Sequence, residues 1–442
     1  MLKCLLFCVI FILFQGIEGN GTAEDLAAVR LLQKYLQINT TTGNDQSAGI
    51  QFWRTLAQRL KASFNTYEYL KGYPVVVIRK RGVNSKLSSI ALISHIDVAP
   101  VADEGKWKYP PFGGNITKDG LMYGRGVQDC KTVSIQYYEA LLNLTKRNVK
   151  LQRDVVIILF TSHEIGLSST VIRSFLTSKE FTSMSVGGGI DEGFTYSSNK
   201  LLLLYQDKAI LVLQIDCYGI ETHGSLMPDS NKTAIGVCAK VITSLQAYRD
   251  AQVEYMKTLA VTDTSNYTSI NLNRLQGAIT DSVLPGRITL RYYINPSINK
   301  TVIEVFNEVK ARVDKINAQI NLTIVRSAEK SPAVRLDASN PFYKAIYDAA
   351  KSLNFDFSPT ITFDQTNAGA LRKYGIPILG FSPLPKTQFL DHGYDEFVDV
   401  RIFLSGIPLY IKCIQNLANI PDKEVTNDPS KYLIDYDKKK YN

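Results

Sequence analysis

Residues 88–100 read SSIALISHIDVAP, and this stretch joins a buried strand to the polar side chains that follow it. The run is short and apolar, as expected of a strand inside a sheet. His95 ends the run and Asp97 follows, so these side chains at i and i+2 should share a face where the strand leaves its sheet. Asp97 is therefore a candidate for orienting His95 toward a metal. Taken alone, a His-x-Asp pair is more often structural than functional.

Similar strand-like runs alternate with helix-like runs from about residue 23 to 200. Apolar residues recur at helical spacing in AEDLAAVRLLQKYLQI (23–38) and SAGIQFWRTLAQRLKASF (47–64). YPVVVIRKR (73–81) and DVVIILFTS (154–162) resemble the quoted strand. This alternation predicts an α/β fold, with helices on the faces of a sheet.

The pattern changes between residues 209 and 322, where longer strands accompany two long helices, 233–257 and 302–316. We interpret this stretch as a smaller α+β module inserted into the first domain. The chain then returns with a helix and two strands, so its last third should complete the first domain. The predicted divisions are 1–19 for a leader, 20–208 and 323–442 for the first domain, and 209–322 for the inserted module.

Composition excludes several classes of protein. The chain has 442 residues, of which 45% are hydrophobic and 21% are charged, as is typical of globular domains. Its formal charge of +9 is spread along the sequence without a basic block interleaved with aromatics, so we expect no nucleic-acid partner. Beyond the first 19 residues, no stretch approaches the roughly 20 apolar residues of a membrane span, so we expect no membrane association.

The first 19 residues, MLKCLLFCVIFILFQGIEG, have the pattern of a secretory signal peptide. The sequence therefore predicts a secreted, extracellular protein. Glycosylation is expected as well, because Asn-x-Ser/Thr sequons occur at Asn20, Asn39, Asn115, Asn143, Asn231, Asn266, Asn299 and Asn321.

Four cysteines follow the predicted leader: Cys130, Cys217, Cys238 and Cys413. No CxxC spacing occurs, which argues against a thiolate metal site. An oxidising compartment would allow a disulfide, for which Cys217 and Cys238 are one candidate pair. The sequence leaves the pairing open.

Further polar side chains stand where predicted strands end. Glu164 follows the strand 154–162, Glu192 lies in GGIDEG, and His392 follows the strand IPILGF. Asp129, in YGRGVQDCK, comes before a helix, where an aspartate is most often an N-cap. Carboxyl ends of parallel strands meet at one crevice, so these residues and His95 should converge. Two histidines and three carboxylates are the ligands that a pair of zinc ions needs, with one carboxylate bridging.

Five motifs in this order carry a resemblance to a known family: SHIDVAP, then PPFGG with YGRGVQDCK, then HEIG, DEG and HGYDE. The chain resembles the dizinc exopeptidases of the aminoacylase-1 and carboxypeptidase S type over about residues 25–420. The resemblance implies a dizinc catalytic domain with an inserted lid and dimerisation domain. It also implies a homodimer that hydrolyses N-acyl-L-amino acids or short peptides.

By position, the resemblance assigns His95, Asp129 and Glu192 to one zinc ion. Asp129, Glu164 and His392 are assigned to the other, with Asp129 bridging and Asp97 orienting His95. His223, in GIETHGS, falls where the family has a histidine that reaches from the lid of the partner chain to polarise the substrate carbonyl. A plain surface histidine is the alternative for His223.

The chain departs from the family in three places. His163 replaces the glutamate that accepts a proton from the attacking water, which removes the usual general base. Asn367 and Gly369 stand where the family has a carboxylate-binding arginine motif, and glycine offers no guanidinium. Ser282, Arg291 and Tyr293 differ from the family in the inserted module. Two hypotheses follow: a secreted zinc amidohydrolase that uses His163 as a substitute base, and a catalytically inactive binding protein that retains the dizinc fold.

Overall fold

The computed structural model describes residues 23–164, 168–260, 263–277 and 280–435. The chain divides into two compact units. The large unit comprises Met1–Tyr205, Ala333–Pro359 and Ala370–Asn442, and the small unit comprises Gln206–Pro332 and Thr360–Gly369. The predicted leader, 1–19, lies outside the described residues. Within the described ranges, no helix combines the length and the hydropathy of a membrane span.

The division differs from the predicted inserted module, 209–322, because the small unit also includes residues 360–369. Hydrogen bonds attach this late segment to the rest of the small unit. The backbone N–H of Thr366 donates to Asp207 at 2.7 Å, and the hydroxyl of Tyr293 donates to Asp364 at 2.6 Å. Both contacts join residues far apart in sequence. The boundaries of the predicted module were set from local sequence patterns, which could not show that residues 360–369 belong to it.

The main sheet of the large unit has eight strands within the described residues, in the order β1-β2-β6-β3-β7-β17-β8-β16. The neighbours β6, β3, β7 and β17 run parallel, whereas β1, β2 and β8 pair antiparallel. The strands are β1 Ser63–Glu68, β2 Pro74–Lys80, β3 Ser89–His95, β6 Val155–Phe160, β7 Val186–Asp191, β8 Lys200–Asp207, β16 Asp356–Thr362 and β17 Ile378–Gly380. The predicted α/β fold is confirmed.

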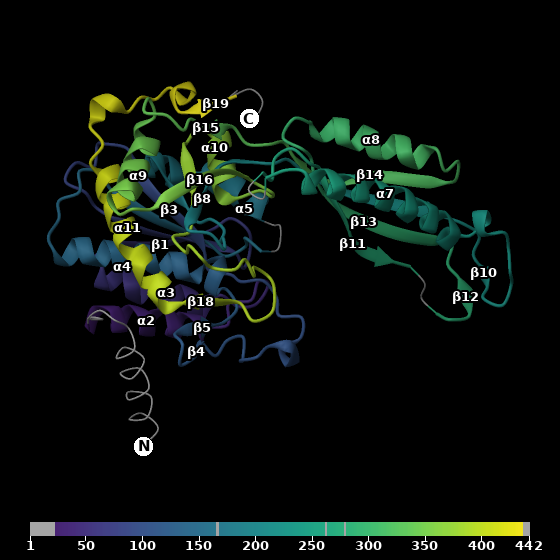
Figure 1. Cartoon of the computed structure of the whole chain (residues 1–442), viewed down its shortest axis with the longest axis horizontal. Coiled ribbons are helices and arrows are strands. Elements are labelled where there is room, and N and C mark those ends of the chain that lie inside the picture. The colour runs from purple at the N-terminus through teal and green to yellow at the C-terminus, as the bar shows by residue number, and fades with distance from the viewer. Residues whose placement is uncertain (1–22, 165–167, 261–262, 278–279, 436–442) are drawn as a thin grey trace, which may run out of the picture. The chain divides into compact units, whose positions relative to one another are not determined.

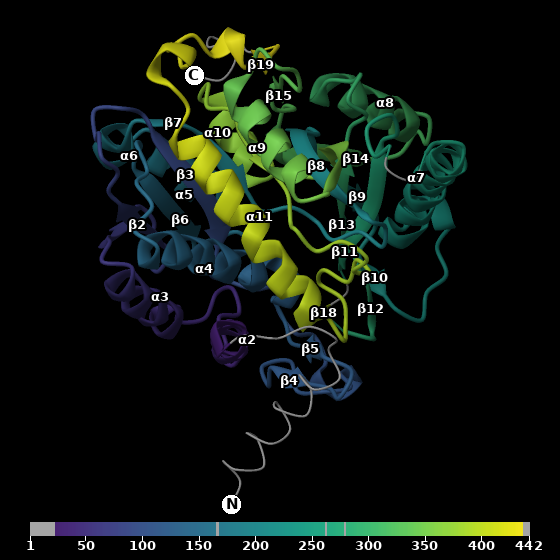
Figure 2. The same ribbon diagram turned by 60° about the vertical axis from the view of Figure 1, so that its left-hand side comes forward.

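The parallel strands are largely apolar because helices cover both faces of this sheet. Alternate residues of β6, including Ile157 and Leu159, belong to the main core, whereas Phe160 faces the other side and meets Phe175 of α5 edge to face. Five helices contribute to the main core, and Figure 2 shows α11 lying across this face beside α4 and α9. These helices are α2 Ala23–Leu36, α3 Ser47–Arg59, α4 Thr132–Lys146, α9 Pro341–Ser352 and α11 Val400–Ala418.

Shorter elements complete the large unit. The helices are α5 Ser168–Leu176, α6 Lys179–Met184 and α10 Asn367–Lys373, and the last of these crosses into the large unit from the small one. A three-stranded sheet contains β4 Asn115–Ile116, β5 Leu121–Tyr123 and β18 Phe397–Asp399, and β15 Ala333–Val334 pairs with β19 Leu433–Ile434. Single helical turns occur at Glu104–Lys106, Val127–Lys131, Asp422–Glu424 and Pro429–Lys431.

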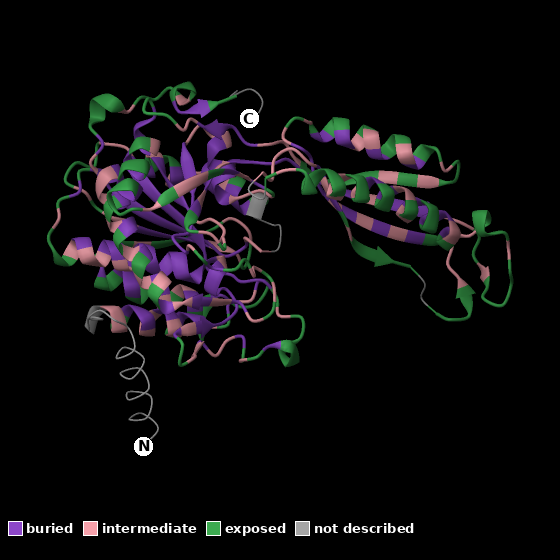
Figure 3. Cartoon of the chain, viewed as in Figure 1, coloured by how far each residue is buried: buried purple, intermediate pink, exposed green. Residues whose placement is uncertain are grey.

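The small unit has a four-stranded sheet in the order β11-β13-β9-β14, with α7 and α8 packed on it (Figure 1). Its own buried core lies between the sheet and these helices. Figure 3 shows exposed residues along the second half of the edge strand β11, beside the buried residues of β13. The elements are β9 Ile210–Tyr218, β10 Thr222–His223, a turn at Ser230–Lys232, α7 Ala234–Lys257, β11 Ser269–Gln276, β12 Val283–Leu284, β13 Arg287–Asn295, α8 Val302–Asp314 and β14 Ile320–Ala328.

Gly189 tests the close packing of the central strands. It pairs with Ala91 of β3 on one side and Ile378 of β17 on the other, and a Cβ at this position would lie 2.0 Å from the Ala91 carbonyl oxygen. We expect Gly189→Ala to lower the free energy of unfolding by about 3 kcal/mol, because backbone atoms of a central strand cannot move aside. Urea denaturation measures the change.

Gly105 supplies the matched control. It is exposed, and the nearest atom to a Cβ there is a carboxylate oxygen of Asp103 at 3.2 Å, which a side-chain rotation can move. Gly105→Ala should change stability little. Equal losses for the two variants would contradict the packing argument.

Candidate metal centre

Four parallel strands bring polar residues to one edge of the large unit's sheet. β3 ends at His95, β7 ends at Asp191 directly before Glu192, and Glu164 follows β6. His392 lies on the loop after β17. The strands are neighbours in the order β6-β3-β7-β17, so their carboxyl ends, and the side chains that follow them, meet.

The structure brings together all five side chains that the sequence predicted as metal ligands. His95 Nε2 lies 2.8 Å from Asp129 Oδ1 and 3.4 Å from Glu192 Oε1. His392 Nε2 lies 3.2 Å from Asp129 Oδ2 and 3.0 Å from Glu164 Oε2. The side chains thus form two groups, each within 4.8 Å, and Asp129 belongs to both. One oxygen of Asp129 faces each group, which is the arrangement of a bridging ligand.

The charges of these groups depend on one another. Burial raises the pKa of Glu192 to about 7, although the neighbouring His95 acts in the opposite direction. Burial also disfavours ionised Asp129, but hydrogen bonds from His392 and His95 outweigh it and hold the Asp129 pKa well below its usual value. Hydrogen bonds to Asp129 and then Glu164 raise the pKa of His392 to about 10.

The donor set fits two divalent cations. Glu164 Oε1 is buried and has no hydrogen-bond partner among the described residues, although it lies near a second carboxylate. A buried carboxylate oxygen without a partner is costly, and a cation would satisfy it. Imidazole nitrogens with carboxylate oxygens are typical zinc ligands. The groups can therefore hold zinc without any rearrangement of the strands.

Asp129 is not the N-cap that its position before a helix indicated. The α4 helix begins at Thr132 after Lys131, and Asp129 has the non-helical angles φ −119° and ψ 90° inside the turn Val127–Lys131. The peptide bond from Asp129 to Cys130 is cis. The Asp129 carboxylate contacts the two imidazoles, at 2.8 Å from His95 and 3.2 Å from His392, instead of a helix N-terminus. Cys130 lies within the first group as well, but its thiol contacts Ser94 Oγ at 2.8 Å.

Sequence reasoning missed the pair that holds the Asp129 loop, Arg125 and Glu396. Buried Glu396 accepts hydrogen bonds from the backbone N–H groups of Gly126 at 3.0 Å and Gln128 at 2.6 Å, and from the Arg125 guanidinium at 2.9 Å. Arg125 also donates to the His392 carbonyl at 3.2 Å. The pair therefore connects the loops that carry Asp129 and His392. Arg125 lies in the motif YGRG and Glu396 in the motif HGYDE. Their presence in these motifs was the one feature of the sequence that could have indicated a role at the site.

Asp97 lies beside His95, but its carboxylate has a different contact from the predicted one. His95 Nδ1 is hydrogen-bonded to the main-chain carbonyl of Asp97 at 2.6 Å, while the nearest carboxylate oxygen is 3.7 Å away. The carboxylate instead accepts the backbone N–H groups of His163 at 3.1 Å and Glu164 at 3.0 Å. Asp97 thereby links β3 to the segment after β6 and fixes residues 163 and 164.

The His163 imidazole lies flat against the His95 ring. The ring centroids are 4.3 Å apart and the planes differ by 12°. His163 is not a member of either ligand group, although it is close enough to the Asp129 and Glu192 carboxyls to favour their ionised forms. Its side chain thus lies next to the candidate ligands without being a member of either group.

The remaining predicted residues lie in the small unit. His223 is exposed, and its Nδ1 contacts Ser225 Oγ at 2.7 Å. At Gly369, a Cβ would lie 1.8 Å from Asp207 Oδ2, so the position accepts no side chain while that carboxylate stays in place. Asp207 is held by Thr366, as described above. Where the family has an arginine, this chain therefore has a glycine, and the Asp207 carboxylate occupies the space that a side chain at 369 would need.

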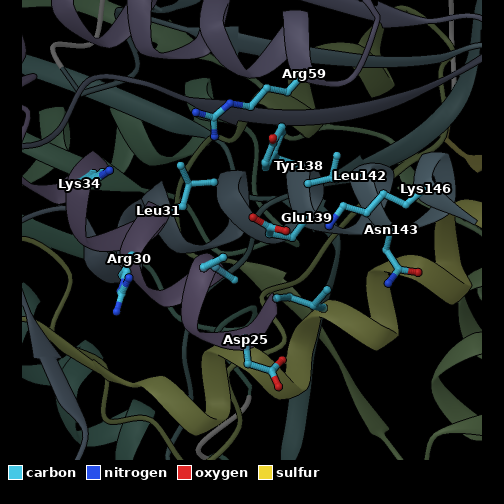
Figure 4. Close-up of a pocket in the computed structure, with 13 residues that line it drawn as sticks. Asp25, Arg30, Leu31, Lys34, Arg59, Tyr138, Glu139, Leu142, Asn143 and Lys146 are labelled. Atoms are coloured by element: carbon cyan, nitrogen blue, oxygen red, sulfur yellow. The ribbon is translucent and has the colours of Figure 1, made fainter. Parts of the chain in front are cut away.

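A separate cavity of about 630 Å³ lies on the large unit among α2, α3, α4 and α11 (Figure 4). Charged residues dominate the side chains labelled there: Asp25, Arg30, Lys34, Arg59, Glu139 and Lys146. The lining includes no member of the two ligand groups. This cavity is thus distinct from the candidate metal centre.

Comparisons with known proteins agree with this geometry. The family model for Peptidase family M20/M25/M40 matches residues 91–416. Human aminoacylase-1 is 28% identical over 91% of this chain and 98% of its own length, and aminoacylase-1 of Dictyostelium discoideum is 25% identical over 89% and 98%. The crystal structure of human carnosine dipeptidase 1 superposes with a TM-score of 0.69 at 16% identity, covering 90% of this chain and 97% of that one.

The family match spans most of the chain, including the residues of both ligand groups. The resemblance inferred from the sequence motifs is confirmed. The chain belongs to peptidase family M20/M25/M40 and has the fold of its metal-dependent amide hydrolases.

Proposed function

We propose that this protein hydrolyses N-acyl-L-amino acids, or short peptides, to a carboxylate and a free amino acid with two zinc ions per chain. The observation that carries the proposal is the Asp129 carboxylate, whose oxygens lie 2.8 Å from His95 and 3.2 Å from His392. Glu192 and Glu164 complete the two groups. Overall similarity to aminoacylase-1 of several organisms supports the substrate class.

Bound zinc would supply a Lewis acid that polarises the scissile carbonyl and lowers the pKa of the attacking water. The protein's own residues supply position and proton transfer. Asp97 fixes the backbone of residues 163 and 164 through two hydrogen bonds. His163 is then held beside the ligand groups, where a ring nitrogen can accept the proton of the attacking water and later pass it to the leaving amine. His223 is proposed to stabilise the oxyanion.

A second candidate is a catalytically inactive binding protein that retains the metal centre. The replacement of a glutamate by His163 favours it, because an imidazole stacked on His95 has a different reach and charge from an extended carboxylate. The crowded Gly369 position also favours it, because no guanidinium can occupy that place. Activity measurements separate the two candidates.

We further propose that the protein is secreted and glycosylated. The leader pattern at 1–19 and the sequons support this assignment. Four of the sequon asparagines, Asn39, Asn231, Asn299 and Asn321, are exposed and thus accessible to a glycan.

The metal assignment predicts close to two zinc ions per chain after mild dialysis. Zinc should also raise the thermal midpoint, because it neutralises carboxylates that repel one another when they are unprotonated. Metal analysis and thermal unfolding with and without a chelator measure these effects. His392→Ala should lose metal, whereas His163→Ala, outside both groups, should keep it. A stoichiometry near zero with no stabilisation by zinc would exclude this site.

The His163 assignment predicts how the rate responds to substitution. On a panel of N-acyl amino acids and dipeptides, His163→Ala should abolish hydrolysis while zinc content stays unchanged. His163→Glu should raise kcat by up to about 10²- to 10⁴-fold, which is the range of general-base catalysis. KM should change less, because position 369 still lacks a cation. An active wild type that is indifferent to His163→Ala would show that another residue accepts the proton.

We also propose a homodimer formed through the small unit, because the resemblance implies that His223 serves the site of the partner chain. Light scattering at micromolar concentration should give twice the chain mass. His223→Ala should lower kcat without changing that mass. A strictly monomeric yet active protein would leave His223 without its proposed role.

A further inference from the structure

The buried core of the small unit contains two cysteines on elements that pack together. Cys217 lies on β9 and Cys238 on α7, and they are 0% and 3% exposed. Cys217 pairs with Ile288 across the sheet, and Cys238 Sγ lies 3.8 Å from the Ile288 carbonyl oxygen. The two thiols are hydrogen-bonded to each other. The sulfur atoms are therefore direct neighbours.

The backbones of β9 and α7 also approach closely beside this pair. A Cβ at Gly219 would lie 2.2 Å from the backbone nitrogen of Ala234, the first residue of α7. Gly219 directly follows β9, two residues after Cys217, and Ala234 shares a helix face with Cys238, one turn later. The two cysteines thus occupy the next facing positions along the same narrow junction. A disulfide requires backbones that approach closely, as these two elements do beside the cysteines.

We propose that Cys217 and Cys238 form a disulfide in the mature protein. A thiolate of one cysteine attacks a disulfide oxidant, such as glutathione disulfide, and releases one thiol from it. The thiolate of the second cysteine then attacks the mixed disulfide and releases the other thiol. One S–S bond forms in the protein and one breaks in the oxidant, which receives two electrons and two protons. The reaction precedes closure of the core, because both thiols are buried afterwards.

This bond would close a covalent ring around the segment that carries His223. The segment leaves β9 after Tyr218 and returns to α7 at Ala234, and the N–H of Ile220 already donates to the Lys232 carbonyl at 2.8 Å. A disulfide at its base restrains both ends of the segment independently of that hydrogen bond. The consequence for catalysis rests on the proposed role of His223, whereas the bond itself does not.

The other two cysteines offer no competing partner in the described structure. Cys130 contacts Ser94 near the metal centre, and Cys413 lies buried on α11. Both belong to the large unit, whereas Cys217 and Cys238 belong to the small one. The structure thus favours one pairing over the alternatives that the sequence left open.

The test uses the full chain produced in a secretory host and denatured in an alkylating agent without reductant. We expect alkylation of Cys130 and Cys413 only, and a cross-linked peptide pair containing Cys217 and Cys238 that separates after reduction. Cys217→Ser should free Cys238 for alkylation, and the matched control Cys413→Ala should leave the cross-link intact. Reduction should lower the thermal midpoint by at least about 4 °C.

Alkylation of all four cysteines in the unreduced wild type, or a cross-link between any other two, would overturn the proposal. The wild-type measurement stands even where Cys217→Ser does not fold. Thiol counting on denatured protein is independent of hydrolysis. An intact cross-link in a protein without activity would therefore count against the proposed function and leave the disulfide established.

Discussion

Burial of the Glu396 carboxylate is the constraint on which the geometry of the metal centre depends. Glu396 has 0% exposure, and it receives the backbone N–H groups of residues 126 and 128 together with the Arg125 guanidinium. Breaking a buried charge pair by removing one partner costs about 3–5 kcal/mol, since the other charge is left uncompensated. The loop that carries Asp129 is therefore held in place by its hydrogen bonds to this buried carboxylate. Arg125 transmits the same restraint to the His392 carbonyl.

Much of the candidate site could be predicted because three of the five candidate ligands stand at or just after the end of a recognisable strand. His95, Glu164 and Glu192 stand at the ends of runs whose apolar character comes from burial on both faces, and parallel order brings such ends together. The contacts that refine the site could not be predicted, because they are backbone hydrogen bonds between segments remote in sequence. Glu396 and Asp97 both act in this way, and the conformation of Asp129 depends on one of them. The β1 strand, SFNTYE, was missed because its residues are mostly exposed and lack an apolar face.

His163 changes the electrostatics of the centre as well as its proton chemistry. Asp129, Glu164 and Glu192 already place three carboxylates close together, and the partly buried Asp391 adds a fourth acidic group whose pKa is raised by desolvation and by Asp129. A glutamate at 163 would add one more negative charge to this cluster. The imidazole instead packs on His95 at 4.3 Å, where a ring of matching shape fills the space. This centre therefore has less charge repulsion to overcome when it assembles.

The attachment of residues 360–369 to the small unit has a consequence for synthesis and folding. During synthesis, residues 206–332 of the small unit are made before residues 333–359, which belong to the large unit and include α9. Residues 360–369, the second part of the small unit, are made only afterwards. Until then Asp207 lacks its contact with Thr366, and Tyr293 lacks Asp364. The buried core of the small unit lies within residues 209–322, but these two contacts form only after residues 360–369 have been made. The small unit is therefore completed only after α9 of the large unit has been made. A fragment of residues 206–332 alone would lack residues 360–369 and the contacts that they make.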